Sequence, residues 1–520
     1  MRAKSLMIQG TGSNVGKSII ACALCRILSQ DGYRVAPFKA QNMSLNSFVT
    51  KDGKEMGRAQ VAQAEAAGVD PMVEMNPILL KPIGDCGSQV VVMGKPLRNM
   101  SAQEYYKCKG EMLVIVKDAY NTLASQFDII VIEGAGSPAE INLKENDIVN
   151  MKMAEIADAP VVLVTDIDRG GAFAWIVGTF ELLNETERNH IFGIVFNKFR
   201  GDPAILQPGI DMLERRTGKQ VLGLVPFING LSIDDEDSVS LDNNPPVPPF
   251  AKGGQGEIID IAIIKLPRIS NFTDFDSFEH HNGVSIRYVD DTNGLGNPDV
   301  IILPGTKNTI GDLLWIRANG LENAIIKCRD TARHAPTMII GICGGYQMMG
   351  KEILDVECVE SNHARIQGMG LLDVTTTFLP EKCTYQAKAN LLPDTLLFST
   401  QNTLTGYEIH MGRTILNNGI RPLLRITERS DKPVDVPDGA VSHDGMHWGT
   451  YFHGIFDNDE FRSQLINFLR KKKGLSPLSI MLSEEKNLTA HKKEIHYDNL
   501  ADIVRNNIKM NLIYKRLGLK

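Results

Sequence analysis

Short apolar segments alternate with helical patterns along most of the chain, and this alternation is what most constrains the fold. Parallel strands need a long crossover connection between them, and helices are the usual crossover. In the first part of the chain, strands are predicted at residues 5–9, 34–38, 129–133, 161–166, 191–197 and 221–226. Several of these are apolar throughout, as expected of strands covered on both faces. The sequence therefore predicts an α/β fold with parallel sheets.

A segment rich in proline and glycine, DNNPPVPPFAKGGQG, interrupts this pattern at residues 242–256 and predicts a linker. Strands are predicted again at residues 259–265, 300–303, 338–342, 371–378, 407–412 and 449–452. From residue 459 the pattern is helical and charged. Because 520 residues exceed what one core usually holds, we expect separate domains. We predict an N-terminal domain over 1–241, a second α/β domain over 257–458, and a helical tail over 459–520 that packs on the second domain.

The composition is that of an ordinary globular protein, with 43% hydrophobic and 22% charged residues. A formal charge of −7 argues against a general nucleic-acid or anionic-membrane surface. Apolar runs stay well short of the roughly 18 residues that span a bilayer. The first residues enter a strand and a glycine loop at once, which leaves no room for a signal peptide. We expect a cytoplasmic protein with no nucleic-acid partner and no membrane span.

The segment MIQGTGSNVGKSIIACAL joins a strand to a helix through a glycine loop that ends in Gly16, Lys17 and Ser18. In a phosphate loop, backbone N–H groups and a helix N-terminus face the anion, with the lysine on the terminal phosphates and the hydroxyl on Mg²⁺. Thr11 stands where the usual spacing has its first glycine, and Gly10 and Gly12 flank it. We expect Gly12, Gly16, Lys17 and Ser18 to bind ATP, with Ser18 also a ligand of Mg²⁺.

The form G-T-x-x-x-V-G-K-S resembles the loop of dethiobiotin synthetase and its relatives. That resemblance implies an ATP-dependent activation of a carboxylate as an acyl phosphate. In PFKAQNMS, Lys39 can reach the transferring phosphate, and in IIVIEGAGS, Glu133 ends a strand as a candidate Mg²⁺ ligand. The alternative for Glu133 is a strand-end carboxylate that caps a neighbouring helix.

The segment MIIGICGGYQMMG runs from a buried strand into Gly341-Ile342-Cys343-Gly344-Gly345. This G-x-C-x-G pattern predicts a nucleophile elbow, a tight strand-to-helix turn that exposes Cys343 at its apex. The N–H of Gly344 is the natural first donor to an oxyanion, and Gly305, in PGTKNT, is the candidate for the second. In GTYFHGIFDN, His453 follows a strand, where its imidazole can act as the base for the thiol.

These residues resemble class I glutamine amidotransferase domains, in which the cysteine attacks the amide of L-glutamine and releases ammonia. Gln347 stands one turn into the helix after the cysteine and is a candidate to contact the amino-acid end of the glutamine. The usual acid stands two residues after the histidine, and that position is Ile455 here. Either a Cys–His dyad suffices or a carboxylate such as Glu408 or Asp457 substitutes, and we favour the dyad.

A dethiobiotin-synthetase-like domain joined to such a glutaminase resembles the cobyrinic acid amidases. The segments FKAQNMSLNS, EGAGSPAEINL, TDIDRGGAFA, LPGTKNT and HGIFDN resemble the cobyric acid synthase family most. The resemblance implies amidation of the b, d, e and g carboxylates of adenosylcobyrinic acid a,c-diamide, a corrinoid. A close alternative is cobyrinic acid a,c-diamide synthase. A partitioning or regulatory ATPase with a phosphate loop is an alternative from another class, but it needs neither the elbow nor His453.

Further polar residues are candidates for orienting the acceptor substrate. These are Gln41, Asn42, Asp147, Asp166 and Asp168, of which the three aspartates are also candidate metal ligands. Carboxylates and amides that follow buried strands often meet at the site edge of a parallel sheet. The alternative for each carboxylate is a helix cap or a turn residue exposed to solvent.

Overall fold

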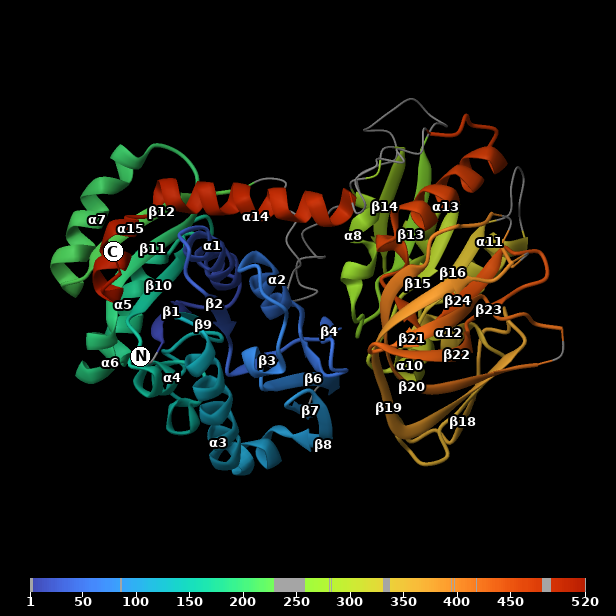
Figure 1. Ribbon diagram of the computed structural model, residues 1–520, viewed down its shortest axis with the longest axis horizontal. Coiled ribbons are helices and arrows are strands. Elements are labelled where there is room, and N and C mark those ends of the chain that lie inside the picture. The colour runs from blue at the N-terminus through green and yellow to red at the C-terminus, as the bar shows by residue number, and fades with distance from the viewer. Residues whose placement is uncertain are drawn as a thin grey trace. The chain divides into compact units, whose positions relative to one another are not determined.

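The computed structural model describes residues 3–84, 87–228, 258–330 without 280 and 282, 337–478 without 394, 397 and 418, and 488–519 (Figure 1). By its internal contacts the chain forms two units. Unit 1 holds Met1–Ser44, Met56–Glu236 and Ala490–Lys520, and unit 2 holds Leu45–Glu55 and Asp237–Thr489. Both are α/β, as predicted. The predicted linker at 242–256 lies outside the described residues.

Unit 1 is built on a parallel six-stranded sheet. Its strands, in sheet order, are β12 (Gln220–Pro226), β11 (Ile191–Phe199), β10 (Val161–Asp166), β1 (Lys4–Gly10), β9 (Ile129–Glu133) and β2 (Val35–Phe38). The central strands β9 and β10 are buried along their whole length, which agrees with their uninterrupted apolar sequences. Because the strands are parallel, their carboxyl ends meet at one edge, where the phosphate loop and Glu133 lie.

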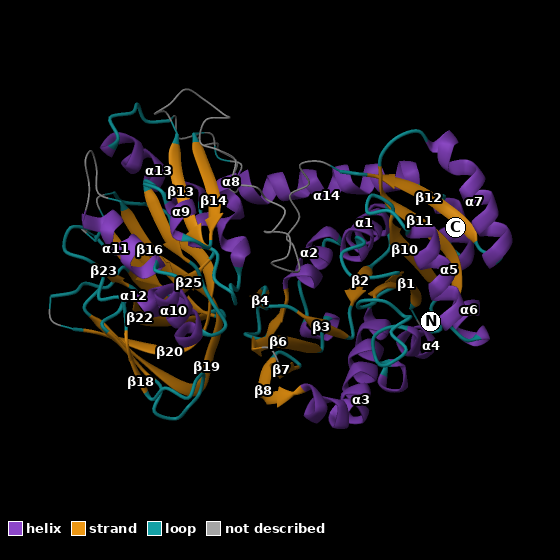
Figure 2. Cartoon of the chain, turned by 180° about the vertical axis from the view of Figure 1, so that it is seen from behind, coloured by secondary structure: helices purple, strands orange, loops and turns teal. Residues whose placement is uncertain are grey.

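Helices surround this sheet (Figure 2). They are α1 (Lys17–Gln30), α2 (Arg58–Ala66), α3 (Ala102–Gln126), α4 (Met151–Ala157), α5 (Ala172–Leu182), α6 (Glu185–His190), α7 (Pro203–Thr217), α14 (Leu488–Asn507) and α15 (Met510–Leu517). Cys22 and Cys25 are buried within α1, and neither forms a disulfide. A second, four-stranded sheet contains β3 (Gln41–Met43), β6 (Ile78–Gly84), β7 (Gly87–Val92) and β8 (Lys95–Ser101).

Unit 2 has a second α/β sheet of six strands, parallel except for the edge strand β23. In order these are β14 (Val284–Val289), β13 (Ile259–Ile264), β15 (Val300–Leu303), β16 (Met338–Ile342), β24 (His447–Thr450) and β23 (Ala440–Val441). Its helices are α8 (Asp276–Glu279), α9 (Thr292–Leu295), α10 (Thr309–Ala318), α11 (Leu321–Asp330), α12 (Gly344–Met349) and α13 (Asp459–Lys472).

A mainly antiparallel sheet completes unit 2. It contains β17 (Glu352–Leu354), β18 (Arg365–Gln367), β19 (Val374–Leu391), β20 (Leu404–Leu416), β21 (Leu424–Arg429), β22 (Lys432–Asp438) and β25 (Phe452–His453). The hairpin of β19 and β20 is much longer than the strands predicted at 371–378 and 407–412. Strand β25 pairs with β20, with His453 opposite Tyr407, and this pairing joins the end of the α/β sheet to the long hairpin.

The structure differs from the predicted domain boundaries in two places. Residues 490–520 pack in unit 1 rather than on the second domain, because Leu500, Val504 and Ile513 join the core around α1. Arg26 of α1 also pairs with Asp498 at 2.7 Å. Residues 45–55, which fall inside the predicted first domain, belong to unit 2.

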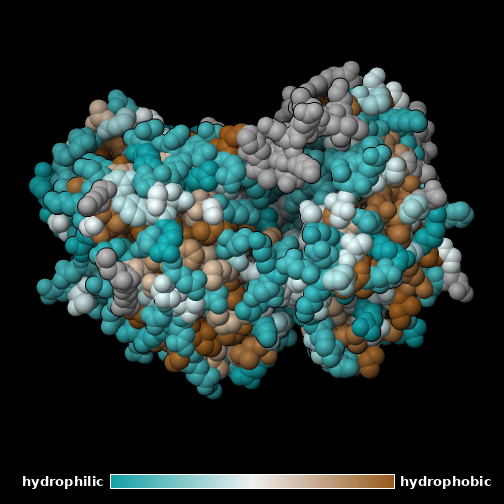
Figure 3. All heavy atoms as spheres, viewed as in Figure 1, coloured by the Kyte–Doolittle hydropathy of each residue, from teal (hydrophilic) through white to brown (hydrophobic). Residues whose placement is uncertain are grey.

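Among the described residues, no helix combines the length and apolar character needed to cross a membrane. On the face drawn in Figure 3, apolar residues form separate groups among hydrophilic ones.

Candidate active site

Cys343 lies at the apex of a sharp turn between β16 and α12. Its backbone has φ 51° and ψ −106°, a conformation that costs energy for any residue other than glycine. The N–H of Cys343 donates to the carbonyl of Thr450 at 2.9 Å, and its carbonyl accepts from the N–H of Gln347 at 3.1 Å, so the turn is held on both sides. Cys343 is 9% exposed as a residue, and its sulfur lies 3.6 Å from the carbonyl oxygen of Ile409. This is the nucleophile elbow that the sequence predicts.

The glycines around the cysteine are required by close backbone packing. A Cβ on Gly345 would lie 1.9 Å from the carbonyl oxygen of Leu303. A Cβ on Gly341 would lie 2.6 Å from the backbone nitrogen of Tyr346. Both neighbours are main-chain atoms that cannot rotate away, so any side chain at these positions would push the elbow apart.

His453 is held by an acid, Asp274, that lies in no motif predicted from the sequence. Its Nδ1 lies 2.6 Å from Oδ2 of Asp274, and the other carboxylate oxygen accepts from the N–H of Gly454 at 3.2 Å. Asp274 lies in a short 3₁₀ helix, η4 (Phe272–Phe275), and both side chains are buried. Among the described residues, the Nε2 atom of His453 accepts and donates no hydrogen bond, and the Cys343 sulfur is the second group, after Asp274, that acts on the imidazole. Thiol, imidazole and carboxylate therefore form a Cys–His–Asp chain.

The environment of His453 stabilises its protonated form. Burial alone would lower the pKa of the imidazole, but the Asp274 carboxylate and the nearby Cys343 sulfur outweigh it and raise that pKa to about 10. An imidazole with this pKa holds a proton at neutral pH. It can keep the proton taken from the thiol until a leaving group needs it.

The partner of His453 is neither Glu408 nor Asp457, the two carboxylates considered from the sequence. The favoured prediction, a Cys–His dyad without an acid, is wrong as well, because Asp274 bonds to the imidazole. Glu408 is engaged by Arg429, whose Nε and Nη2 lie 2.6 and 2.7 Å from its oxygens. Asp457 is exposed in the 3₁₀ helix η5 (Ile455–Asp457). The usual acid position, Ile455, is a buried core residue. A segment 179 residues away in the sequence supplies the acid instead.

The predicted oxyanion glycines meet beside the cysteine and the histidine. A Cβ on Gly305 would lie 3.4 Å from Cε1 of His453, and one on Gly344 would lie 3.1 Å from the N–H nitrogen of Thr306. Gln347 is buried in α12, where its Oε1 accepts from Thr309 at 2.9 Å and its Nε2 donates to the Tyr451 hydroxyl at 3.2 Å. The structure thus gathers Gly305, Gly344 and Gln347 at one site in unit 2.

The phosphate loop of unit 1 follows β1 and opens α1. Gly16 has φ 98°, and a Cβ there would lie 2.0 Å from Nδ2 of Asn197, which itself donates to the carbonyl of Val15 at 2.9 Å. Lys17 reaches back over the loop, with Nζ 2.8 Å from the carbonyl of Gly12 and 3.1 Å from that of Gly136. Gly12, Gly16 and Lys17 are therefore placed as a phosphate loop requires.

Glu133 is the centre of a buried polar cluster at the end of β9. Its Oε1 accepts from Ser18 at 2.9 Å and from Lys39 at 3.0 Å, and its Oε2 accepts from Gln63 at 2.6 Å. Burial would raise the pKa of this carboxyl, but the Lys39 charge and the three hydrogen bonds lower it below its usual value. Asn42 extends the cluster through a 3.0 Å bond to Gln60. The cluster therefore holds an ionised carboxylate.

The donor set fits Mg²⁺. The ion prefers oxygen ligands and is usually held by one or two carboxylates together with substrate phosphates. Ser18 Oγ and an ionised carboxylate oxygen of Glu133 lie side by side at the foot of the phosphate loop. These two residues would hold the ion, while phosphate oxygens and water would complete its shell.

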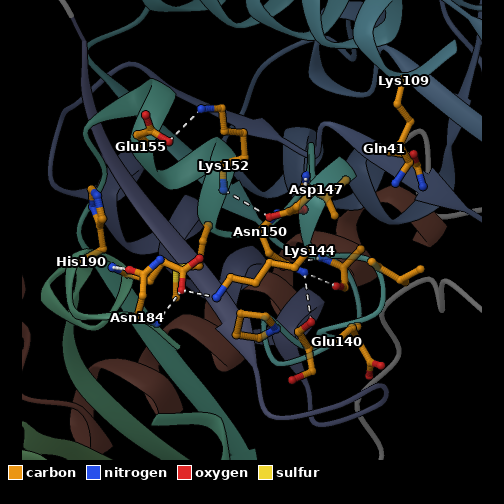
Figure 4. Close-up of a pocket in the computed structure, with 18 of the residues that line it drawn as sticks. Gln41, Lys109, Glu140, Lys144, Asp147, Asn150, Lys152, Glu155, Asn184 and His190 are labelled. Atoms are coloured by element: carbon orange, nitrogen blue, oxygen red, sulfur yellow. Dashed lines mark hydrogen bonds and ion pairs between the residues drawn. The ribbon is translucent and has the colours of Figure 1, made fainter. Parts of the chain in front are cut away.

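A cavity of about 400 Å³ opens beside Gly136, the residue whose carbonyl bonds to Lys17. Gln41 and Lys109 lie on one side of it, and His190 and Asn184 lie on the other (Figure 4). Asp147 lines the cavity too, with Oδ1 accepting from the N–H groups of Val149 and Asn150 at 2.8 and 2.9 Å. Two of the predicted acceptor-orienting residues, Gln41 and Asp147, therefore share this cavity, in which Asp147 also fixes a turn.

Asp166 and Asp168 both form ion pairs with basic side chains. Asp166 is buried and lies 2.8 Å from Nζ of Lys198, which also donates to the carbonyl of Asn14 in the phosphate loop. Asp168 pairs with Arg200 at 3.1 Å. Among the described residues, no group of three or more His, Cys, Asp or Glu is arranged to hold a metal. Of the two pairs, that of Asp166 and Lys198 contacts the phosphate loop, and the metal-binding or substrate-orienting roles of both aspartates stay predictions.

Two known families cover most of the chain. Residues 6–240 match the CobQ/CobB/MinD/ParA nucleotide binding domain, and residues 260–461 match the CobB/CobQ-like glutamine amidotransferase domain. The first match contains the phosphate loop and Glu133, and the second contains Asp274, Cys343 and His453.

Curated relatives extend over the full length. A cobyric acid synthase of Pelotomaculum thermopropionicum is 52% identical over 99% of this chain and 97% of its own. Those of Desulforamulus reducens and Caldanaerobacter subterraneus are 49% and 50% identical, each over 99% of this chain and 98% of the relative. Such identity along both units makes the chain a member of the cobyric acid synthase family, and hence a glutamine-hydrolysing carbon–nitrogen ligase.

Proposed function

We propose that this enzyme amidates the b, d, e and g carboxylates of adenosylcobyrinic acid a,c-diamide and produces adenosylcobyric acid, with ATP and L-glutamine as co-substrates. The observation that carries the proposal is the presence of two separate chemical sites on one chain. One has a histidine bonded to an aspartate beside a cysteine, and the other has a phosphate loop beside an ionised carboxylate. The full-length likeness to cobyric acid synthases supports the corrinoid as the acceptor.

In unit 2, His453 takes the thiol proton of Cys343 on Nε2, and the sulfur attacks the amide carbon of glutamine. The N–H groups of Gly344 and Gly305 stabilise the negative charge that forms on the amide oxygen. His453 then protonates the departing nitrogen, and ammonia leaves a glutamyl thioester on Cys343. Water hydrolyses the thioester, with His453 again accepting the proton. Asp274 keeps Nδ1 protonated and stabilises the imidazolium throughout.

In unit 1, the carboxylate acceptor must first be activated, because a carboxylate is a poor electrophile. ATP supplies the phosphoryl group that converts it to an acyl phosphate, which ammonia then displaces. Lys17 and Lys39 lie where they can neutralise charge on the transferring phosphoryl group. Mg²⁺, when bound by Ser18 and Glu133, would neutralise phosphate charge and fix the phosphates in line.

The acceptor would enter the cavity lined by Gln41 and Asp147, which lies next to the phosphate loop. Its lining combines amide, carboxylate and ammonium groups with the apolar side chains of Met43, Leu143 and Val149. A corrinoid has a similar mixture, with polar side chains around an apolar ring. Because the reaction consumes ATP and glutamine, we expect it to take place in the cytoplasm.

The test is a reconstituted reaction with ATP, Mg²⁺, glutamine and a panel of corrinoids that differ in which carboxylates are already amidated. Product masses show how many amides form. Amidation of the a,c-diamide at its remaining b, d, e and g acids is expected. Preference for a corrinoid with free a and c acids would favour a cobyrinic acid a,c-diamide synthase instead. Finding no ATP-dependent amidation of any corrinoid would refute the proposal.

A further inference from the structure

Residues 45–55 lie within the sequence that matches the nucleotide-binding domain, yet they are part of unit 2. The chain leaves unit 1 after Ser44 and returns at Met56. This stretch contains β4 (Ser47–Val49) and the first residue of β5 (Glu55–Gly57), which pair as a small two-stranded sheet closed by a 2.8 Å bond from the N–H of Thr50 to the carbonyl of Lys54. We call residues 45–55 the inserted hairpin.

The inserted hairpin is anchored in unit 2 by buried contacts. The carboxylate of Glu55 pairs with Lys382 of β19 at 2.5 Å, with side chains only 1% and 10% exposed. Gln386, also of β19, donates to the carbonyl of Val49. Val49 itself is buried against Tyr407 and Ile409 of β20. An ion pair this deeply buried and a shared apolar cluster fix the hairpin on the β19–β20 face.

Its first residues hold the segment that carries Asp274. The N–H of Ser47 donates to Oδ1 of Asn271 at 3.1 Å, and Thr273 donates to Oδ1 of Asn46 at 3.3 Å. Asn271 has φ 51° and begins η4, the short helix in which Asp274 lies. A single-turn helix has little stability of its own. Its position therefore depends on these contacts with the hairpin.

The hairpin also supports the face of the catalytic imidazole. The ring of Phe48 packs against that of Tyr407 at 5.5 Å, and Tyr407 stacks on His453 at 5.1 Å with an interplanar angle of 11°. The Tyr407 hydroxyl accepts from Nδ2 of Asn271 at 3.3 Å. The two groups that orient the imidazole, Asp274 and Tyr407, are thus both braced by residues 46–48.

We propose that the inserted hairpin is a positioning element of the glutaminase, which acts through Asn271 and Tyr407 to set the orientation of His453. The hairpin residues do not take part in the chemistry. They hold the imidazole in line with both Asp274 and Cys343, so that part of the glutaminase is encoded within the nucleotide-binding half of the sequence. This inference rests on the proposed glutaminase function of Cys343 and His453.

The primary test is Phe48→Ala, assayed for glutamine hydrolysis and for ammonium-driven amidation. Misorienting a catalytic group by a fraction of an ångström to one ångström costs on the order of 10- to 100-fold in rate, and we expect a fall of that size in the kcat for glutamine hydrolysis. The KM for glutamine should change little, and the ammonium-driven reaction should be retained. The alkaline limb of the pH–kcat profile should move to lower pH, since a displaced imidazole loses its pairing with Asp274.

Two controls separate positioning from a loss of folded protein. Lys54→Ala alters the same hairpin at its turn, where Lys54 pairs with Asp52 at 2.9 Å, and should behave as the unaltered enzyme. Phe48→Tyr keeps the ring over Tyr407 and should restore the rate. Partial unfolding would instead lower both activities together and leave the pH limb in place, and that result would overturn the proposal.

A second variant, Asn271→Gly, tests the same role independently, in case Phe48→Ala does not fold. Asn271→Gly removes the bonds to Ser47 and Tyr407, and glycine adopts the φ of 51° without strain. The same kcat loss and pH shift are expected. Cys343→Ala is run alongside: if it still hydrolyses glutamine, the proposed function itself fails. If it is inactive while Phe48→Ala and Asn271→Gly keep full rate and profile, only the positioning role is refuted.

Discussion

At the scale of single residues, the candidate glutaminase site contains a partner that local sequence could not reveal. Cys343 and His453 were predictable, because each lies in a short motif whose spacing reflects a turn. Asp274 was not, since it precedes His453 by 179 residues and stands in NFTDF, a segment without a distinctive pattern. Its role arises only when η4 and β25 are brought together by tertiary packing. The usual acid position, two residues after His453, is filled by buried Ile455. The motif around His453 therefore gave no indication of an acid partner.

Asp274→Asn tests this partner directly. The carboxylate raises the pKa of His453 to about 10, so its loss should lower that pKa and move the alkaline limb of the pH–kcat profile to lower pH. The wrong tautomer should also reduce kcat on the order of 10²- to 10⁴-fold, as amide replacement does in other triads. The assay is glutamine hydrolysis between neutral and alkaline pH. Asp457→Asn is the matched control, and an equal loss there would contradict the assignment.

Cys343→Ala separates the two chemistries. Glutamine hydrolysis should fall to background because the nucleophile is gone, while amidation driven by added ammonium should persist, since the site in unit 1 is unaltered. The exposed free cysteine Cys358 provides the control, and Cys358→Ala should retain both activities. Loss of the ammonium-driven reaction in Cys343→Ala would show that the two sites are not separable.

Glu133→Gln should abolish amidation and leave glutamine hydrolysis intact, the opposite result to Cys343→Ala. The neutral amide can no longer hold Mg²⁺ as an anion and leaves the buried charge of Lys39 without its 3.0 Å partner. We expect amidation to be lost with either nitrogen source, while glutamine hydrolysis by unit 2 continues. Product mass and glutamate release report the two activities. Retained amidation at unchanged Mg²⁺ dependence would remove Glu133 from the metal site.

At the scale of elements, strands buried on both faces were predicted most accurately. The predicted ranges 129–133, 161–166, 300–303 and 338–342 coincide with β9, β10, β15 and β16. Apolar runs bounded by glycine or charge define such strands without reference to anything distant. The β19–β20 hairpin was predicted too short, because much of its length is half-exposed and its pairing is set by the partner strand.

The close packing of the elbow predicts how Gly345→Ala changes the free energy of unfolding. In Gly345→Ala the new Cβ would meet the Leu303 carbonyl at 1.9 Å, so β15 and α12 must move apart. Overpacking of this kind typically costs about 1–3 kcal/mol, and the displaced elbow should also lose glutaminase activity. Denaturant unfolding measures the cost. Gly110→Ala is the control, since it lies in helix α3 with open space around it and should be neutral or stabilising by up to about 1 kcal/mol.

At the scale of the whole molecule, each folded unit is built from stretches that are not consecutive in the sequence. The inserted hairpin and the C-terminal helices each belong to a unit other than the one suggested by their neighbours in sequence. Periodicity identifies α14 and α15 as helices but says nothing about which core receives their apolar side chains. That depends on a complementary surface, here supplied by α1 and by Leu222 of β12.

Leu500→Ala tests where the tail contributes stability. Leu500 is fully buried in the core of unit 1, and removing such a side chain typically costs about 2–5 kcal/mol. The loss should appear in the unfolding transition that ATP and Mg²⁺ shift upward, because a ligand stabilises the unit that binds it. Glutamine hydrolysis should survive at temperatures where that transition is complete. Ile495→Ala, at a position 45% exposed on the same helix, should leave the transition in place. If Leu500→Ala destabilised the glutaminase and spared the ATP-responsive transition, the tail would have to be assigned to unit 2 after all.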